Sequence, residues 1–517
     1  MSSRFSSLTY QLFMSSMLAL LLIPVRALAL FSASEISSPV SAVDVSNPTT
    51  IVGNGTPSSC TEDTFTQAVA KGGKITFNCG SSPYTLVLSS EKTITSDTVI
   101  DGGNLVTLSG GNNVRILSLK SSYDQNSPSL TVQKITLANG YTTDVPNTTS
   151  TTQGGAAIYR LGGTLSVINS TFTNNVGPVT GQDVAGGAIY SVGGGTTTIV
   201  GSVFKGNQAS NGGAIGSLGS ALTIVNSKIS DNTATGNGGN PGNGGNGGGI
   251  YLDGENSYFG VAVNLSGVKV TNNKGNAYGG GLMHVAYHGE TTTIDKSSFD
   301  NNTIPNQSVS FAGGVYLQGT NITMTNSSVS KNTANGPGGM YVGPGSVLNM
   351  TNDTVAQNTA VTGLGGGLFI DNNVSGKILN STIAGNQTPG PYSFGAAIAG
   401  GSTNLLLGNT IIANNTVGNA YNPISCTQKL GNLGGNLQYP ITRQGGGSDD
   451  PNSLCSDGVI KADPQLGSLQ DNGGLTLTIA PAQNSPAVHQ SQNNCPTTDE
   501  RGQPRPTPCT IGAYELP

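Results

Sequence analysis

The sequence predicts an all-β fold, a right-handed parallel β-helix of about 12 coils. Three observations support this prediction. Pairs of glycine followed by an aliphatic residue recur through the middle of the chain, each pair precedes three short β-prone runs, and the aliphatic residue keeps its place in every copy. The second glycines stand between 25 (Gly314 to Gly339) and 36 (Gly213 to Gly249) residues apart, at Gly155, Gly187, Gly213, Gly249, Gly281, Gly314, Gly339 and Gly367. A period of this size is typical of a solenoid, and the right hand follows from the general preference for right-handed crossovers.

The copy from Gly186 to Asn207 shows how one coil is built. Its three β-prone runs lie around Ile189, Ile199 and Phe204, and each run is bounded by Gly or Asn. Several other copies carry an Asn-Ser pair between the second and third runs. Asn suits a tight corner because it tolerates the left-handed backbone region. Stacked corners therefore predict an asparagine ladder.

Two columns of apolar residues should fill the interior, because side chains alternate between the faces of a strand. The first column follows the glycine pairs, and the second lies in the third run. They comprise Ile158, Ile189, Ile215, Ile250, Leu282, Val315, Met340 and Leu368, and Phe172, Phe204, Ile229, Phe299, Val329, Val355 and Ile383. One coil cannot offset the cost of ordering its own backbone, so stability belongs to the stack.

The array is predicted over 51–425. Nine coils run from Gly154 to about Asn415, and earlier β-prone segments suggest about three more. Thr61 to Ala70 reads as a short helix that caps the first coil, since Phe65 and Val69 form an apolar stripe. The region 426–517 is predicted to be a C-terminal cap that contains disulfides.

The N-terminus is typical of a secretory signal over 1–29, followed by a linker over 30–50. Arg4 lies in the basic region, Met17 to Val25 is apolar apart from Pro24, and Ala27-Leu28-Ala29 resembles a cleavage site. The alternative is a membrane anchor, but this apolar run is too short to span a bilayer. We therefore expect a secreted protein or one on the cell-envelope surface, without a transmembrane segment after cleavage.

Six cysteines agree with export, because disulfides persist in oxidising compartments. All six lie outside the repeats, at Cys60, Cys79, Cys426, Cys455, Cys495 and Cys509. Nearest-neighbour pairing is our choice among the fifteen connectivities that six cysteines allow. The absence of a CxxC pair or an adjacent His disfavours a metal site, and no cofactor is expected.

Composition disfavours nucleic acid as a partner. Charged residues are 9% of the chain, the net charge is −5, and Arg160 is the only arginine between Thr131 and Pro440. Nucleic-acid binding needs clustered Lys and Arg.

Three sets of motifs resemble known surface proteins. The Gly-Gly-Ala-Ile and Phe-x-x-Asn pairs, as in Gly186 to Ile189 with Phe204 to Asn207, resemble repeats of polymorphic outer membrane proteins, which are adhesin-like and β-helical. Cys60 to Phe65 through Ile75 to Phe77 resembles the N-terminal cap of pectin-lyase-like surface proteins. C-terminal motifs resemble the choice-of-anchor Q domain, namely Asp463 to Gly467, Asp471 to Gly474, Ser485 to Val488, Asp499 to Gly502 and Ile511 to Glu515.

This resemblance implies an exported β-helix of poorly defined function, and it supplies no active site. Two departures from the families stand out: no translocating barrel and no anchor follow Tyr514. We therefore expect release outside the cell or retention by non-covalent contact.

Catalysis is disfavoured, although β-helices often degrade acidic polysaccharides. Elimination needs an Arg or Lys base with carboxylates that hold Ca²⁺, and no Asp cluster accompanies Arg160. Hydrolysis needs paired carboxylates. The possible pairs are Asp449 with Asp450, Asp253 with Glu255, and Asp295 with Asp300.

Two histidines raise the question of a zinc site. His284 and His288 would share a face on a helix, but here they should lie on a strand and its loop, so we interpret both as surface residues.

The residue after each buried aliphatic should point outward and align from coil to coil. It is aromatic in six copies, at Tyr159, Tyr190, Tyr251, Tyr316, Tyr341 and Phe369, with Met283 among them. Such a file could bind a glycan or a surface protein, because aromatics give large contacts at low entropy cost. The interpretation that we favour for these rings is that they simply stack on one another and shield the strand. The leading hypothesis is a binding or adhesion protein; a polysaccharide lyase or glycoside hydrolase is the alternative, and a structural envelope spacer is the third.

Overall fold

The computed structural model describes residues 36–142, 151–239, 241–254, 262–305, 310–440 and 454–516. These residues belong to one unit that begins at Ile36. The predicted signal over 1–29, Glu255 and the pair Asp449-Asp450 lie outside the described residues. No described helix is long and apolar enough to cross a membrane.

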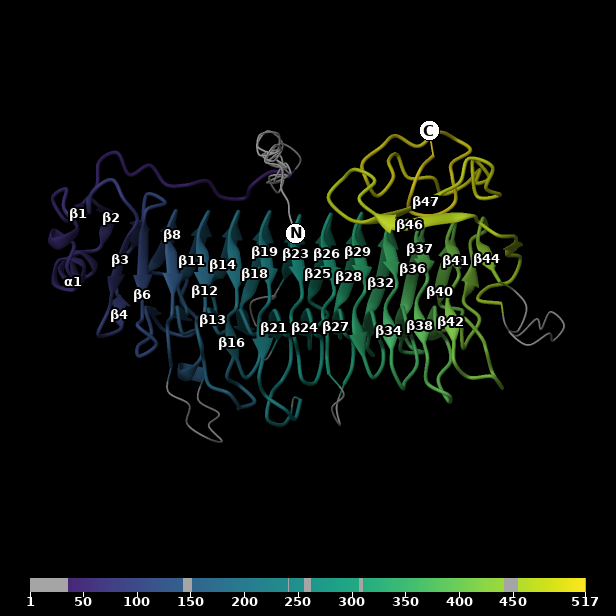
Figure 1. Cartoon of the computed structure of the whole chain (residues 1–517), viewed down its shortest axis with the longest axis horizontal. Coiled ribbons are helices and arrows are strands. Elements are labelled where there is room, and N and C mark those ends of the chain that lie inside the picture. Colours follow the sequence, from purple (N-terminus) through teal and green to yellow (C-terminus); the bar gives the residue numbers. More distant parts are fainter. Residues whose placement is uncertain are drawn as a thin grey trace, which may run out of the picture. The chain divides into compact units, whose positions relative to one another are not determined.

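The described residues form a parallel β-solenoid of about 13 turns, close to the predicted 12 (Figure 1). Three long sheets, here called A, B and C, have 14, 14 and 11 strands. Each coil passes from sheet C to sheet A and then to sheet B. Strands in equivalent places pair in parallel without a shift, as Ile158 pairs with Ile189 and Ile189 with Ile215.

Sheet A consists of β1 (Thr50–Val52), β2 (Gly73–Phe77), β5 (Thr98–Asp101), β8 (Ser129–Gln133), β11 (Thr164–Ile168), β14 (Thr196–Val200), β18 (Ala221–Val225), β22 (Val263–Ser266), β25 (Thr291–Asp295), β28 (Asn321–Thr325), β32 (Val347–Thr351), β36 (Ser375–Leu379), β40 (Leu405–Gly408) and β43 (Gly431–Asn432). Sheet B consists of β3 (Tyr84–Val87), β6 (Val106–Ser109), β9 (Thr136–Ala138), β12 (Thr171–Thr173), β15 (Val203–Lys205), β19 (Lys228–Ser230), β23 (Lys269–Thr271), β26 (Ser298–Asp300), β29 (Ser328–Ser330), β33 (Thr354–Ala356), β37 (Thr382–Ala384), β41 (Ile411–Ala413), β44 (Leu437–Tyr439) and β45 (Ile460–Lys461).

Sheet C consists of β4 (Lys92–Ile94), β7 (Leu117–Lys120), β10 (Ile158–Leu161), β13 (Ile189–Val192), β17 (Ile215–Leu218), β21 (Ile250–Asp253), β24 (Leu282–Val285), β27 (Val315–Gln318), β31 (Met340–Val342), β35 (Leu368–Ile370) and β39 (Ile398–Gly400). Shorter pairings lie between sheets B and C, formed by β16 (Gln208–Ala209), β20 (Thr233–Ala234), β30 (Thr333–Ala334), β34 (Thr359–Ala360), β38 (Gln387–Thr388) and β42 (Thr416–Val417). The remaining elements are α1 (Glu62–Lys71), two 3₁₀ turns (Pro57–Ser59 and Thr151–Gln153) and the antiparallel pair β46 (Leu466–Gln470) and β47 (Thr478–Pro481).

Both predicted interior columns are buried. The rings of Phe172 and Phe204 stack with their centroids 4.6 Å apart, one coil above the next. This confirms that the glycine pairs mark the coil period.

Asparagine forms a ladder, but at a different corner from the predicted Asn-Ser turns. The ladder consists of the Asn that closes the third strand, from Asn175 to Asn415. Asn302 Nδ2 donates to Asn332 Oδ1 at 3.1 Å, and the amide N–H of Asn302 donates to the same oxygen at 2.8 Å. At the Asn-Ser corners the Asn residues have positive φ, and the hydroxyls stack instead: Ser202 N donates to Ser227 Oγ at 3.1 Å. The side chain that faces inward at each corner therefore builds the ladder.

The predicted N-terminal helix is confirmed as α1. Phe65, Ala68 and Val69 are buried against the first coil, and Thr61 with Thr64 forms a capping box. All three predicted disulfides form, with Sγ–Sγ distances of 1.98 Å (Cys60–Cys79), 1.99 Å (Cys426–Cys455) and 2.17 Å (Cys495–Cys509).

The residues after β45 do not simply close the end of the stack. Residues 463–516, here called the C-terminal lobe, lie along the outer face of sheet B (Figure 1). Leu469 and Ile479 pack on Ala356 and Ala384, while Ile511 packs in a second cluster with the outward side chains of β41. Sheet B carries alanine at this outward position in β33, β37 and β41 but Lys205, Ser230 and Asp300 in earlier strands. The lobe therefore sits where sheet B becomes apolar on its outer side.

Candidate functional site

The predicted aromatic file exists on the outer side of sheet C. Strand pairing places Tyr159 beside Tyr190, Tyr316 beside Tyr341, and Tyr341 beside Phe369. Ring centroids of these neighbours are 6.4, 4.6 and 5.8 Å apart. The rings thus contact one another in two runs, and Tyr251 stands between them, with Gly216 on one side and Met283 on the other.

The first part of the file is covered, contrary to the expectation that outward rings would be accessible. Tyr159 is 2% exposed, and Tyr190 and Tyr251 are fully buried. Connections between sheets B and C cross over these rings: Ala185 packs in the same cluster, and the Tyr190 hydroxyl donates to Asp183 O at 2.9 Å. We call Tyr159, Tyr190 and Tyr251 the covered rings.

An arginine closes the cover at the N-terminal end. The Arg115 guanidinium lies 5.1 Å from the centre of the Tyr159 ring and pairs with Glu91 at 3.0 Å. It also donates to the backbone carbonyls of Gly154 and Gly155 at 3.0 and 3.1 Å. The covered rings therefore form a second apolar core outside the main one.

The later part of the file reaches the surface. Tyr316 is 9% exposed, while Tyr341 and Phe369 are half-buried. Burial raises the pKa of both Tyr316 and Tyr341, so their hydroxyls stay protonated as donors, and Tyr316 donates to Gln318 Oε1 at 2.8 Å. We call Tyr341 and Phe369 the open rings.

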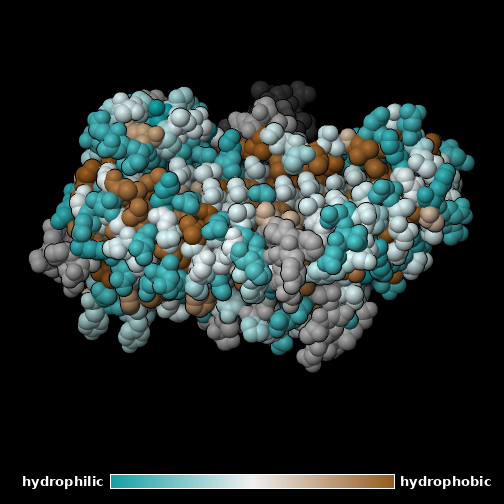
Figure 2. All heavy atoms as spheres, turned by 180° about the vertical axis from the view of Figure 1, so that it is seen from behind, coloured by the Kyte–Doolittle hydropathy of each residue, from teal (hydrophilic) through white to brown (hydrophobic). Residues whose placement is uncertain are grey.

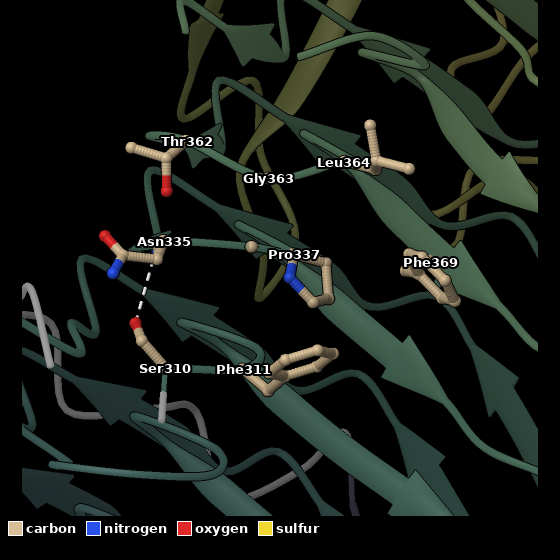
Figure 3. A pocket seen from close by; sticks show the side chains of 9 residues that line it. Ser310, Phe311, Asn335, Pro337, Thr362, Gly363, Leu364 and Phe369 are labelled. Carbon is tan, nitrogen blue, oxygen red and sulfur yellow. Dashed lines mark hydrogen bonds between the residues drawn. The ribbon is translucent and has the colours of Figure 1, made fainter. Parts of the chain in front are cut away.

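An open hollow of about 430 Å³ lies beside the open rings. Its apolar side chains are Phe311, Pro337, Leu364 and Phe369, and its polar side chains are Ser310, Asn335 and Thr362. Figure 3 shows that these come from successive coils in two columns, with the polar residues on one side and the first three apolar residues on the other. Ser310 Oγ accepts a hydrogen bond from the Asn335 backbone N–H at 2.9 Å. We call these two columns the amphipathic stripe.

Arg160 is a structural residue and not an accessible base. It is fully buried, and its Nη1 donates to the carbonyls of Gly163 and Gly194 at 2.7 and 2.6 Å. Its Nη2 donates to the Ser220 hydroxyl. Burial lowers the pKa of Arg160 to about 10, so it remains a cation that joins neighbouring coils.

Of the acidic pairs considered for hydrolysis, only Asp295 with Asp300 lies wholly within the described residues, and these two carboxylates stand on different sheets. Asp253 is buried and accepts from the Tyr251 hydroxyl at 3.1 Å. Asp295 lies on sheet A and accepts from Thr325 at 2.7 Å, whereas Asp300 lies on sheet B and accepts from Ser330 at 2.5 Å. Each carboxylate is thus held by hydroxyl groups of its own neighbours.

The interpretation of both histidines as surface residues is wrong for His284. It pairs in register with Leu252 and Leu317, so its ring points into the core, where Nδ1 lies 2.9 Å from Thr292 Oγ1. Burial lowers its pKa to about 4. His288 is exposed, with Nδ1 3.6 Å from Glu290 Oε1. No group of three or more metal-binding side chains occurs among the described residues.

Sequence reasoning missed a buried acidic cluster under the C-terminal lobe. Glu500 is 2% exposed and accepts from the hydroxyls of Thr354 and Thr476. Burial raises its pKa well above the usual range, and buried Asp353 and Asp499 act in the same direction. Asp353 stands where other corners carry Ser, and this difference is visible in the sequence as an acidic residue at a buried corner position.

Comparisons with known proteins support the β-helical architecture and show no specific function. A family model described as "Right handed beta helix region" matches residues 248–429. A search with the sequence finds no match among curated proteins.

Several solved structures resemble the chain at low identity. The A-module of a mannuronan C-5 epimerase of Azotobacter vinelandii is 13% identical, with a TM-score of 0.44 over 74% of this chain and 95% of that one. A periplasmic alginate epimerase is 11% identical, with a TM-score of 0.40 over 69% and 77%. A surface adhesin of Streptococcus pneumoniae is 12% identical, with a TM-score of 0.32 over 76% and 95%. Likeness at this level says nothing about the activity of this chain, which contains a right-handed β-helix region within a longer parallel solenoid.

Proposed function

We propose that this chain is an exported binding protein of the cell envelope or its surroundings, and that the amphipathic stripe with the open rings binds a glycan. The observation that supports this proposal is the hollow of about 430 Å³, in which Phe311 and Phe369 stand beside a column of hydrogen-bonding side chains. Concave sites with an apolar lining and a few convergent polar groups are typical of ligand binding. A sugar ring offers the complementary surface, since it has an apolar face and a rim of hydroxyls.

The site supplies binding groups and lacks an arranged set of catalytic groups. None of the residues that line the hollow is Asp, Glu, His, Lys or Arg. General acid–base catalysis needs a titratable group within hydrogen-bond reach of the reacting atom. Binding without turnover is therefore the function that we propose, and a lyase or hydrolase remains the outcome that the experiment must exclude.

The export and the location of the protein are proposed from the sequence. The predicted signal over 1–29 and three disulfides suit an oxidising compartment.

A glycan array together with a panel of acidic polysaccharides tests the proposal. Purified protein should retain one or more glycans without releasing new reducing ends or unsaturated products. The double variant Phe311→Ser and Phe369→Ser should lose that retention, whereas Tyr123→Ser, a half-exposed ring several coils away, should keep it. Release of products would replace the proposal with the enzyme alternative, and retention unchanged by the double variant would move binding away from this site.

A further inference from the structure

The connections between sheets B and C continue the hollow toward the C-terminal end. Thr362 N donates to Asn335 O at 3.0 Å, and Gly418 N donates to Thr388 O at 2.8 Å, so these loops stack in register. Gly390 approaches Thr362 so closely that an added Cβ would lie 3.2 Å from the Thr362 Cα. The wall of the hollow therefore extends over two further coils.

Each of these further loops presents a tyrosine at its tip. Tyr392 is 84% exposed and Tyr421 is 90% exposed, more than any other large hydrophobic residue that the structure describes. A hydrogen bond closes the turn in each loop. Ser393 N donates to Gly390 O at 3.0 Å, and Tyr421 N donates to Asn419 Oδ1 at 2.9 Å. Both loops thus carry a solvent-exposed aromatic ring on a hydrogen-bonded turn.

The charge of this surface selects the kind of ligand. No charged residue lines the hollow, and burial, together with the nearby carboxylate of Asp371, raises the pKa of Tyr341. The face opposite to Figure 1 is mostly hydrophilic or neutral in hydropathy, with separate hydrophobic patches (Figure 2). A polyanion would find no cation here to compensate its charge, so an uncharged ligand fits better.

The regular spacing of the residues on this surface favours a polymeric ligand. Successive coils lie about 4.8 Å apart, as strands do within a sheet. The amphipathic stripe repeats a polar and an apolar residue at each of three coils, Ser310 with Phe311, Asn335 with Pro337, and Thr362 with Leu364. A linear glycan repeats an apolar face and hydroxyls along its length, and it therefore complements a surface that repeats an apolar and a polar side chain.

We infer that the site takes an uncharged linear glycan that lies along the solenoid, from the amphipathic stripe across Tyr392 to Tyr421. This inference rests on the proposed function and deepens it. The hollow holds the first sugar units, and the two exposed tyrosines stack on later units of the same chain. Stacking on aromatic rings is tolerant of the exact sugar because it uses the apolar face.

Length dependence tests this inference. Binding is measured by calorimetry with cello-oligosaccharides and laminari-oligosaccharides of increasing length and with polygalacturonate, on the full chain after export. For the wild-type protein we expect affinity that rises with the length of a neutral oligosaccharide. In the double variant Tyr392→Ser and Tyr421→Ser we expect an unchanged affinity for the shortest ligand and a loss of about 5- to 100-fold for the longest.

The outcomes separate this inference from the proposed function. The inference is overturned if the tyrosine double variant binds long ligands as tightly as the wild-type protein does, or if the protein prefers polygalacturonate. The variant Phe311→Ser still tests binding in the hollow in either case. Absence of binding to every glycan overturns both and points to a protein partner. Because both tyrosines are exposed, the double variant should melt with the wild-type protein, and Tyr123→Ser serves as the matched control.

Discussion

The covered rings and the open rings occupy the same place in successive coils, yet they differ in what surrounds them. Tyr190 and Tyr251 are fully buried beneath connecting loops, whereas Tyr341 and Phe369 stay half-buried beside a hollow. The same residue type in the same register is thus a core residue in one part and a surface residue in the other. The loops that pass over the strand therefore distinguish the two roles, and not the alternation of the strand itself.

The largest expected effect is that a substitution among the covered rings lowers stability, whereas a substitution among the open rings lowers glycan binding. Tyr190→Ser removes a fully buried ring, so we expect a loss of about 3–5 kcal/mol in the free energy of unfolding. Phe369→Ser should cost less than about 2 kcal/mol and should abolish glycan retention. Denaturant unfolding and glycan binding on both variants measure this. Similar stability losses in the two variants would contradict the distinction.

Acid should weaken the coil that lies between the two parts. Burial lowers the pKa of His284 from 6.5 to about 4, so the unfolded chain binds a proton before the folded chain does. Stability should therefore be full above pH 6.5 and fall by about 3 kcal/mol as the pH drops toward 4. His284→Leu matches the residues in register, Leu252 and Leu317, and should flatten this dependence in thermal melts across that range. A parallel fall in the variant would assign the acid effect to other groups.

A smaller effect is expected from opening the cover itself. Arg115→Leu removes the cation over Tyr159 and the hydrogen bonds to Gly154 and Gly155. We expect a loss of about 2 kcal/mol, together with greater access of a quencher to tyrosine. Tyrosine fluorescence reports this directly, since the chain contains no Trp. If the open rings lost their ligand at the same time, the two parts would not be independent.

The smallest effect on the covered and open rings should come from a substitution under the C-terminal lobe, because this lobe contacts sheet B, whereas the rings lie on sheet C. Burial raises the pKa of Glu500, so its contribution is full below its ordinary pKa and is lost as the pH rises through the raised value. Glu500→Gln should therefore remove a decline in stability that sets in as the pH rises above the ordinary pKa of Glu, which is the opposite sign to His284. Melting profiles against pH test this, and glycan binding should not change. Unchanged profiles would show that Glu500 does not couple the lobe to pH.

The sequence was sufficient for the coil, because glycine pairs, aliphatic columns and paired cysteines are local signals. It was not sufficient for what covers the coil. One signal was available: Gly248 follows Asn232 by sixteen residues, but the equivalent Gly338 follows Asn332 by six. The longer connection lies in the covered part, and the shorter one lies beside the open rings.

The sequence also contains a signal for the position of the C-terminal lobe beside sheet B, but this signal can be recognised only when the register of the strands is known. The outward residue of sheet B changes from Ser330 to Ala356, Ala384 and Ala413. A short alanine in a strand has no obvious partner when the sequence is read alone. The hollow could not be predicted, because its lining combines residues from several loops whose stacking follows from tertiary contacts.

The most direct test is a crystal structure of the protein with a bound neutral oligosaccharide. The account predicts a sugar ring against Phe369 and Phe311, hydroxyls directed at Asn335 and Thr362, and the chain of sugars pointing toward Tyr392. A ligand seated under the loops over Tyr190, or on the C-terminal lobe, would contradict it.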